Sequence, residues 1–318
     1  MKKVFVLGGT GFVGVSVCVQ LLQQGWQVTV PTRSAIKAYP VPSLVGMTLL
    51  ELDVHDEATL RRGLAGHDAL VNLVAILHGT QALFEHVHVR LVEKLARACV
   101  AAGIKQLVHV SAIGANAQQP LSAPSMYLRS KGQGEAVLLS AAARSEPPAF
   151  DLTILRPSVI FGPDDKFLNV FAQLQRTLPL MPLAGANARF QPVWVEDVAS
   201  AVRRSLERAD DARVSRAPLI LELCGPDVFT LRELVQLSAR LSGIRHGQGR
   251  PVLALPRWLG RLQATLMELA PGKPLMSRDN VDSMQIDNVA SGKVPGLSYL
   301  GITATSLVPI ASAYLGRV

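Results

Sequence analysis

Residues 4–14 read VFVLGGTGFVG, and the fold of the chain can be worked out from this stretch. An apolar, strand-like run is followed by Gly8, Gly11 and Gly14, spaced G-x-x-G-x-x-G, where a helix-period segment begins. The first glycine permits a sharp turn, the second lets the backbone approach a pyrophosphate, and the third lets the helix pack against the strand. The helix N-terminus then directs unpaired N–H groups at the phosphates. The stretch therefore predicts a strand–turn–helix unit that binds a dinucleotide.

Apolar runs alternate with helix-period segments along the chain. This alternation predicts right-handed crossovers and an α/β Rossmann fold, a doubly wound parallel sheet with helices on both faces. We expect residues 1–157 with 190–225 to form this domain, and the less regular 158–189 with 226–318 to form a smaller C-terminal substrate or cap region. The expected strands are 4–7, 27–30, 49–52, 69–75, 107–110, 152–155 and 219–223, and the main helices 13–24, 56–64, 83–99 and 197–206.

Composition and charge exclude several classes of protein. Hydrophobic residues make up 49% of the 318 residues, which excludes a disordered chain. The net charge is +8, and the first 50 residues hold Lys2, Lys3, Arg33 and Lys37 but no acid before Glu51. Because no basic run is longer than a pair, we expect no nucleic-acid partner. The local surplus of positive charge instead indicates a small anion near the glycine-rich turn.

Cysteine usage and hydropathy bear on location. The three cysteines lie far apart without a CxxC motif, which favours a reducing compartment over a disulfide framework or a zinc site. The 23 residues 294–316 carry no charge but contain many small polar residues, prolines and glycines. We therefore expect a loop there and a short helix capped by Thr305 or Ser306, in preference to a membrane span. The expected location is cytoplasmic.

The end of the second expected strand bears on the choice between NAD and NADP. An NAD site usually places an acid there for the ribose hydroxyls, whereas residues 29–34 read TVPTRS. Arg33, supported by Ser34 and Lys37, is placed to bind a 2′-phosphate, which predicts NADP(H) in preference to NAD(H). A solvated arginine is the alternative. After the third strand, the carboxylate of the pair Asp53–Val54 is placed to accept from the adenine amino group, or is a plain loop residue.

Residues 127–131 read YLRSK and place Tyr127 and Lys131 one turn apart on one helix face. A phenol with a pKa near 10 is a poor acid or base at neutral pH. A lysine cation one turn away favours the phenolate and can hold the nicotinamide ribose. The pair thus suits proton transfer coupled to hydride transfer.

These motifs resemble the extended or atypical branch of the short-chain dehydrogenase/reductase superfamily. The matching pieces are GGTGFVG at 8–14, DALVNLVA at 68–75, HVSAIGA at 109–115, YLRSK at 127–131, LRPSVIFGP at 155–163 and FQPVWVEDVA at 190–199. The chain is most similar to the family of complex I NADH dehydrogenase alpha-subcomplex subunit nine and its bacterial relatives, in which the cofactor is often regarded as structural.

The resemblance implies roles for individual residues. It implies a phosphate loop, a segment beside the adenosine half, a set facing the nicotinamide end and a set near the carboxamide. These sets are, in that order, Gly8, Thr10, Gly11, Phe12, Val13 and Gly14; Leu73, Val74 and Ala75; Ser111, Tyr127 and Lys131; and Pro157, Ser158 and Val159. The chain departs from active members after Ser111, where Ala112, Ile113 and Gly114 offer no second Ser or Thr. Ser111 is therefore either catalytic or only part of the strand end.

Two functions follow from these features. The first is an NADP-dependent oxidoreductase or epimerase/dehydratase-type enzyme that uses Tyr127 and Lys131 on an unknown small molecule. The second is a non-catalytic accessory or sensor protein of a respiratory complex, peripheral at the inner membrane. Residues 256–271 predict a helix with Trp258, Leu259, Leu262, Leu266 and Leu269 on one side, either a packing face of the C-terminal region or a docking surface, with Arg257 and Arg261 near lipid headgroups.

The histidines predict no metal site. His86 and His88 stand two residues apart on a helix and so point to different faces. His109, in an expected buried strand, is interpreted as a hydrogen-bonded core residue.

Overall fold

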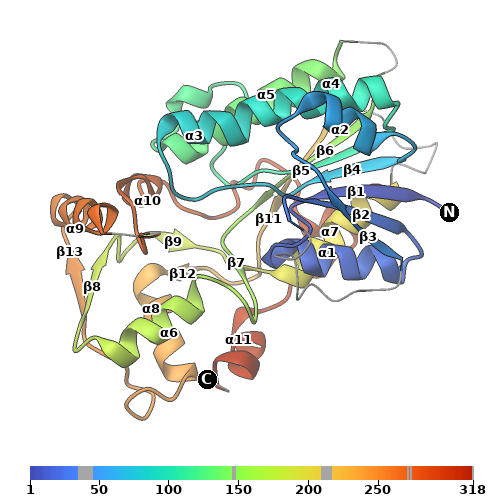
Figure 1. Cartoon of the computed structure of the whole chain (residues 1–318). Helices are drawn as coiled ribbons and strands as arrows, with labels where there is room; N and C mark the ends of the chain where they lie inside the picture. The colour runs from blue at the N-terminus through green and yellow to red at the C-terminus, as the bar shows by residue number, and fades with distance from the viewer. Residues whose placement is uncertain (35–45, 145–147, 209–216, 271, 273, 317–318) are drawn as a thin grey trace.

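The computed structural model describes residues 1–34, 46–144, 148–208, 217–270, 272 and 274–316. Its centre is a parallel seven-stranded sheet with the order β11-β6-β5-β4-β1-β2-β3, shown in Figure 1. The order reverses between β1 and β4, so the predicted doubly wound α/β fold is confirmed. The strands are β1 Lys3–Leu7, β2 Gln27–Thr32, β3 Met47–Glu51, β4 Ala69–Asn72, β5 Gln106–Val110, β6 Asp151–Pro157 and β11 Leu219–Leu223.

Helices cover both faces of this sheet (Figure 1). One face carries α2 (Glu57–Leu64), α4 (Leu91–Ala102) and α5 (Met126–Ala142), which pack against one another in that order. The other face carries α1 (Phe12–Gln23) against α7 (Val195–Arg208). A separate apolar core fills the space beneath each layer. The carboxyl ends of all seven strands therefore share one edge, where ligands of such sheets bind.

Local chemistry explains where several helices begin and end. The Asp56 carboxylate accepts from the first-turn N–H groups of α2, as an N-cap does. Thr230 and Glu233 form a capping box at the start of α8 (Leu231–Leu241). Gly103 ends α4 in the left-handed conformation, with φ +69°, which glycine adopts without a steric penalty.

Two predicted elements differ from the structure. The strand expected over 69–75 ends at Asn72, because the side-chain oxygen of Asn72 accepts from the N–H of Val74 and turns the chain. The helix expected over 83–99 is interrupted by a π-helical turn, η1 (His86–Arg90), between α3 (Gln81–Glu85) and α4. The wider turn changes which face α3 presents, and Leu83 of the expected apolar face is exposed.

The remaining elements form a C-terminal region beside the carboxyl edge of the sheet, at the left and lower left of Figure 1. Its strands pair only two by two, and it has its own apolar clusters. The division of the chain into two domains stays a prediction. The elements are β7 Ile160–Phe161, α6 Leu168–Thr177, β8 Met181–Ala184, β9 Arg189–Phe190, β10 Val193–Trp194, β12 Phe229–Thr230, α8, β13 Val252–Leu255, α9 Arg257–Leu269, α10 Arg278–Ser283 and α11 Leu307–Leu315. Two 3₁₀ turns pack on the sheet and its helices instead: η2 Pro120–Ser122 against α5, and η3 Leu297–Leu300 against α7 and β11.

Of the two alternatives for the apolar side of α9, the structure excludes a packing face within the C-terminal region. That side is exposed: Trp258 is 67% exposed, Leu266 62% and Leu269 78%. Gly260 and Ala264 instead face the protein, because only small residues fit where α9 lies against β8.

The uncharged C-terminal stretch forms a loop and the short helix α11, as predicted. Ser306 stands at the N-cap position without a side-chain bond, and the Thr305 hydroxyl donates to Asp197. Among the described residues, no helix combines the length and apolar character needed to cross a bilayer.

Candidate functional site

The turn between β1 and α1 is built to hold a phosphate. Gly8 has φ +79°, a conformation that favours glycine, and Gly11 is the N-cap of α1. A Cβ on Gly14 would lie 2.2 Å from the Gly8 carbonyl oxygen, so the helix packs against the turn only because this residue is glycine. The first turn of α1 contains no acid, and its N–H groups have no partner within the helix. The turn Gly8–Gly14 and the first N–H groups of α1 therefore form a glycine cradle that can hold an anion.

Gly9 is a further requirement that the sequence reasoning missed. A Cβ there would lie 2.7 and 2.9 Å from the two methyl carbons of Val30 on β2. The doubled glycine at positions 8 and 9 was the available signal. Gly8 therefore gives the turn its conformation, while Gly9 lets the turn lie close to the neighbouring strand.

The predicted adenosine residues lie where β2 and β3 end. Thr32 pairs with Glu51 across these strands, so Arg33 and Asp53 leave the sheet side by side. Arg33 is exposed, and no carboxylate in the described part of the chain forms an ion pair with it. The Asp53 carboxylate accepts from the His55 N–H at 2.9 Å. Ser34 and Val54 flank this corner, and Lys37 lies outside the described residues.

The segment after β4 runs beside the phosphate turn. A Cβ on Gly8 would lie 3.2 Å from the carbonyl carbon of Leu73, which places the two backbones in close contact. Val74 is half-buried and Ala75 is exposed. Asn72, at the end of β4, anchors the start of this segment to the sheet, because its side-chain amide donates to Nδ1 of the buried His109 on β5 at 3.0 Å. The interpretation of His109 as a hydrogen-bonded core residue is therefore confirmed.

Tyr127 and Lys131 lie on α5 beside the end of β5. Lys131 is 1% exposed, and its ammonium group donates to the Val110 carbonyl at 2.8 Å. Burial lowers the pKa of Lys131 to about 8, with Glu135 acting in the opposite direction. Burial also raises the pKa of Tyr127 to about 12. A phenol with this pKa carries its proton at neutral pH in the protein without cofactor, and the effect of Lys131 on the phenolate stays a prediction.

Ser111 follows β5 and is the third predicted nicotinamide-end residue. Its N–H donates to the Leu155 carbonyl at 2.7 Å, which makes it part of the strand end. Its hydroxyl is buried and has no hydrogen-bond partner. A buried hydroxyl without a partner is costly in a finished protein. This group therefore fits a site that a polar ligand completes.

The predicted carboxamide residues are held by the C-terminal region. The Ser158 hydroxyl donates to Asn288, whose side-chain oxygen also accepts from the Val159 N–H at 2.8 Å. Pro157 is buried at the end of β6. Ser158 is thus already bonded within the protein, and Asn288 is a residue that the sequence reasoning did not single out.

Two other carboxylates that the sequence reasoning missed fix α5. Glu135, fully buried, makes a bidentate ion pair with Arg156 of β6, with oxygen–nitrogen distances of 2.9 and 2.5 Å. Its position one turn after Lys131 was a readable signal. Asp279 of α10 accepts from the backbone N–H groups of Met126 at 2.6 Å and Tyr127 at 3.0 Å. No sequence pattern links these positions, 152 residues apart in the chain.

The π-helical turn places His88 inside the protein, where it joins three segments. The Ile76 N–H donates to His88 Nε2 at 3.1 Å, so Nδ1 carries the proton and donates to the Ser130 hydroxyl at 2.8 Å. Ser130 in turn donates to the Tyr127 carbonyl at 2.8 Å. Burial lowers the pKa of His88 to about 3, which keeps the ring neutral. No group of His, Cys, Asp and Glu in the described chain could hold a metal ion.

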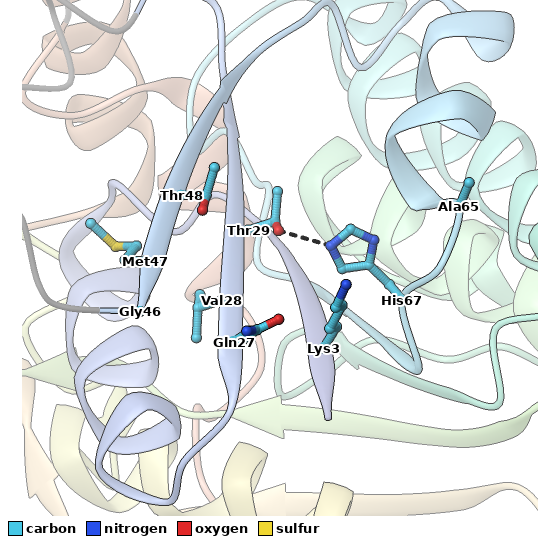
Figure 2. A pocket seen from close by; sticks show the side chains of 9 residues that line it. All are labelled: Lys3, Gln27, Val28, Thr29, Gly46, Met47, Thr48, Ala65 and His67. Atoms are coloured by element: carbon cyan, nitrogen blue, oxygen red, sulfur yellow. Dashed lines mark hydrogen bonds between the residues drawn. The ribbon is translucent and has the colours of Figure 1, made fainter. Parts of the chain in front are cut away.

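A hollow of about 350 Å³ lies at the opposite, amino end of the sheet. Figure 2 shows it beneath the first residues of β1, β2 and β3, with a hydrogen bond of 2.8 Å between His67 and Thr29. Because ligands of doubly wound sheets bind at the carboxyl ends of the strands, this hollow is separate from the site described above.

The parallel sheet, the glycine-rich turn and the Tyr–Lys helix together define a protein of the short-chain dehydrogenase/reductase type. Residues 4–218 match the model of the NAD dependent epimerase/dehydratase family, and the chain belongs to this family.

The named relatives include a subunit of NADH dehydrogenase and a ketoreductase. The chain is 33% identical over 313 residues to NADH dehydrogenase [ubiquinone] 1 alpha subcomplex subunit 9, mitochondrial, of Rattus norvegicus, covering 95% of this chain and 76% of that protein. It is 28% identical over 227 residues to 4-hydroxy-2-methyl-3-oxo-4-farnesyl-3,4-dihydroquinoline-1-oxide ketoreductase of Stigmatella aurantiaca, covering 67% and 66%. MoeE5 in complex with UDP-glucuronic acid and NAD has the same fold, with a TM-score of 0.70 at 19% identity and coverage of 98% and 97%.

Proposed function

We propose that the protein binds NADP(H) along the carboxyl edge of the sheet. The glycine cradle at the start of α1 supports a pyrophosphate there, and the segment 73–75 follows directly beside it. We further propose that residues 1–157 with 190–225 bind the cofactor, while 158–189 with 226–318 form the substrate side. In this arrangement Asp53 and Val54 contact adenine, and Pro157, Ser158 and Val159 lie near the carboxamide.

The preference for NADP(H) rests on Arg33 and Ser34 at the end of β2. Arg33 is exposed beside the proposed adenosine ribose and has no ion-pair partner among the described residues, so a 2′-phosphate can pair with it. Calorimetric titration of NADPH and NADH tests this proposal. We expect wild type to bind NADPH more tightly and Arg33→Ala to lose most of the difference. Equal affinities of wild type for the two cofactors would overturn it.

For the chemistry, we propose an oxidoreductase or epimerase-type reaction that uses Tyr127 and Lys131. The observation that carries this proposal is the position of Tyr127 and Lys131 one turn apart on α5. The Lys131 ammonium there donates to the carbonyl of Val110, the residue before Ser111, whose buried hydroxyl has no hydrogen-bond partner. Bound NADPH would supply a hydride. Tyr127 would donate its proton to the substrate carbonyl oxygen, Lys131 would hold the cofactor ribose, and Ser111 would donate a hydrogen bond to the same carbonyl.

Substitution of Tyr127 separates catalysis from binding. With NADPH and a panel of ketones and nucleotide sugars, Tyr127→Phe should lower turnover by at least about 100-fold while NADPH affinity changes little. Tyr299→Phe, at an exposed tyrosine, serves as the matched control and should keep full turnover. Turnover that survives in Tyr127→Phe would overturn the assignment of Tyr127 as proton donor.

A second candidate function is that of a non-catalytic NADPH-binding subunit of a membrane-bound respiratory complex. The observation that favours it is the exposed apolar stripe of Trp258, Leu262, Leu266 and Leu269 on α9, together with the name of the Rattus norvegicus relative. Arg257 and Arg261 do not reach out freely toward headgroups, because both pair with Asp282. The stripe therefore favours a protein surface as its partner.

Membrane fractionation tests this candidate. The wild-type protein should co-sediment with a respiratory complex, and the double variant Leu262→Ser/Leu266→Ser should not. Leu121→Ser, an exposed leucine on η2, is the matched control and should behave as wild type. NADPH turnover by the purified protein alone would favour the enzyme instead.

A further inference from the structure

A buried histidine lies beside the proposed proton donor. His88 is 2% exposed and belongs to the π-helical turn η1, which packs against α5. The turn and the helix lie close together, because a Cβ on Gly134 of α5 would clash with the His88 carbonyl oxygen. A glycine at this position therefore lets η1 approach α5. π-helical turns are frequent at functional sites, so the role of this histidine is worth deriving from its contacts.

The Tyr127 ring packs against two rings from this segment. The ring centroids of His88 and Tyr127 are 5.6 Å apart with an interplanar angle of 78°, and those of Phe84 and Tyr127 are 6.2 Å apart with an angle of 64°. Phe84 and His88 also contact each other, with centroids 5.7 Å apart. Edge-to-face contacts of this kind favour one relative orientation of the rings. Two neighbouring rings therefore restrict the phenol.

The hydrogen bonds of His88 lead to the backbone of the same tyrosine. His88 Nδ1 donates to the Ser130 hydroxyl at 2.8 Å, and this hydroxyl donates to the Tyr127 carbonyl at 2.8 Å. At the other ring nitrogen, Nε2 accepts from the Ile76 N–H at 3.1 Å. His88 thus acts on Tyr127 twice, by packing against its side chain and through Ser130 on its main chain.

These hydrogen bonds fix the imidazole and leave it no part in proton transfer. Because the Ile76 N–H occupies the lone pair of Nε2, this nitrogen is not free to accept a proton from Tyr127. The Nδ1 proton is bound by Ser130, whose own proton is bound by a carbonyl oxygen. Rotation of the ring would break both of its hydrogen bonds inside the protein, which is costly. The contribution of His88 to the site is therefore orientation.

We propose that His88 is a positioning residue for Tyr127 and fixes the phenol in the orientation from which it donates its proton to the substrate carbonyl. This inference rests on the proposed use of Tyr127 as proton donor. A reacting group that is held in the correct orientation lowers the barrier of the chemical step. Loss of the His88 hydrogen bonds should therefore lower kcat more than it alters cofactor binding.

The proposed cofactor segment after β4 has anchors of its own. The Leu73 N–H donates to the Leu7 carbonyl at 3.0 Å, and the Val74 N–H donates to the side chain of Asn72 at 3.1 Å. Neither bond involves His88. Removal of the two imidazole nitrogens should therefore leave this segment in place and keep the affinity for NADPH close to that of wild type.

Two substitutions separate the ring packing of His88 from its hydrogen bonds. His88→Phe keeps an aromatic ring next to Tyr127 but can neither accept from the Ile76 N–H nor donate to Ser130. His88→Gln keeps a donor and an acceptor in its side-chain amide. His67→Phe is the matched control, because His67 is a half-buried histidine that binds a hydroxyl at the opposite, amino end of the sheet.

Steady-state kinetics with NADPH and the panel of ketones and nucleotide sugars give the first measurement. His88→Phe should lower kcat by at least about 10-fold while the KM for NADPH changes by less than about threefold. His88→Gln should recover most of kcat, and His67→Phe should equal wild type. Ser130→Ala, which breaks only the link to the Tyr127 carbonyl, should lower kcat by a smaller factor. Unchanged kcat in both His88→Phe and Ser130→Ala, in a protein whose turnover Tyr127→Phe abolishes, would overturn the role of His88 alone.

A titration of the phenol tests the orientation without a substrate. In protein with ¹³C-labelled tyrosine rings, the NMR signal that is missing in Tyr127→Phe reports Tyr127, whose pKa burial raises to about 12. A phenol released by His88→Phe should gain contact with water and ionise at about pH 10. A phenol that keeps its high pKa in this variant is held by packing alone, which would overturn the role of the hydrogen bonds. Turnover that survives in Tyr127→Phe would instead overturn the proposed chemistry, whatever the titration shows.

Discussion

Helices α5 and α9 distribute polar and apolar residues in opposite ways. Helix α5 buries a lysine and a glutamate, Lys131 and Glu135, between the sheet and α4. Helix α9 has a clear apolar stripe but turns it to solvent, and it buries only Gly260 and Ala264. Each arrangement costs stability, because buried charge loses hydration and exposed leucine keeps its contact with water.

The difference teaches where to look for function in this chain. On α5 the unfavourable feature lies at the carboxyl edge of the sheet, beside the phosphate cradle, where buried charge can act on a bound cofactor. On α9 it lies on the outside, where only another surface can remove the apolar side chains from water. Helix α10 touches both, since Asp279 binds the start of α5 and Asp282 pairs with Arg257 and Arg261 of α9.

The largest expected effect comes from breaking the buried ion pair of α5. Glu135→Gln removes one charge and leaves the Arg156 guanidinium, only 12% exposed, without its partner. We expect a loss of about 3–5 kcal/mol in the free energy of unfolding, measured by urea denaturation. Glu85→Gln breaks an exposed pair with Arg90 and should cost less than about 1 kcal/mol. Equal losses in the two variants would show that α5 is not held by buried charge.

Substitution of Lys131 should change the free energy of unfolding in the opposite direction. Its pKa is lowered to about 8 in the folded protein, so at lower pH folding carries the full cost of burying a cation. Lys131→Met should therefore stabilise the cofactor-free protein by about 2 kcal/mol at pH 7. The gain should shrink as pH rises from 8 toward the pKa of an unfolded lysine, because wild type then folds with a neutral amine. Thermal unfolding at pH 7 and pH 10 measures this, and a destabilised variant at pH 7 would contradict it.

The contact between α10 and α5 should have a smaller effect. Asp279→Asn keeps the shape of the side chain but replaces one of its two acceptor oxygens with an NH₂ group. Because this group cannot accept a hydrogen bond, either the Met126 or the Tyr127 N–H loses its partner. We expect a loss of about 1 kcal/mol, because one first-turn N–H of α5 loses its acceptor while the N-cap Ser125 stays in place. Asp287→Asn, which breaks an exposed pair with Arg189, is the matched control and should be nearly neutral. Urea denaturation of both variants measures whether the contact between Asp279 and the start of α5 stabilises the fold.

The same contrast explains how much the sequence could predict. The sheet, its strands and the phosphate turn follow from local periodicity and glycine spacing, and the parallel direction of the strands follows from their alternation with helices. Pairings between distant segments have no local signal, so Asp279 and Asn288 were not predicted. Asn72 shortened β4 by a side-chain turn, and the π-helical turn at His86–Arg90 moved Leu83 outward, because both depend on hydrogen bonding that periodicity does not encode.

The exposed side of α9 should give the smallest change in stability. A leucine that is 52% or 62% exposed contributes little to folding, so Leu262→Ser/Leu266→Ser should alter the free energy of unfolding of the purified protein by less than about 1 kcal/mol. Gly260→Ala on the opposite side is the control, because its Cβ would lie 2.4 Å from the Ala184 Cβ and should cost about 1–3 kcal/mol. A loss of the same size in the double variant would mean that the stripe packs within the chain, and the docking surface would then have no basis. A neutral double variant leaves association with another surface as the property to which Leu262 and Leu266 contribute.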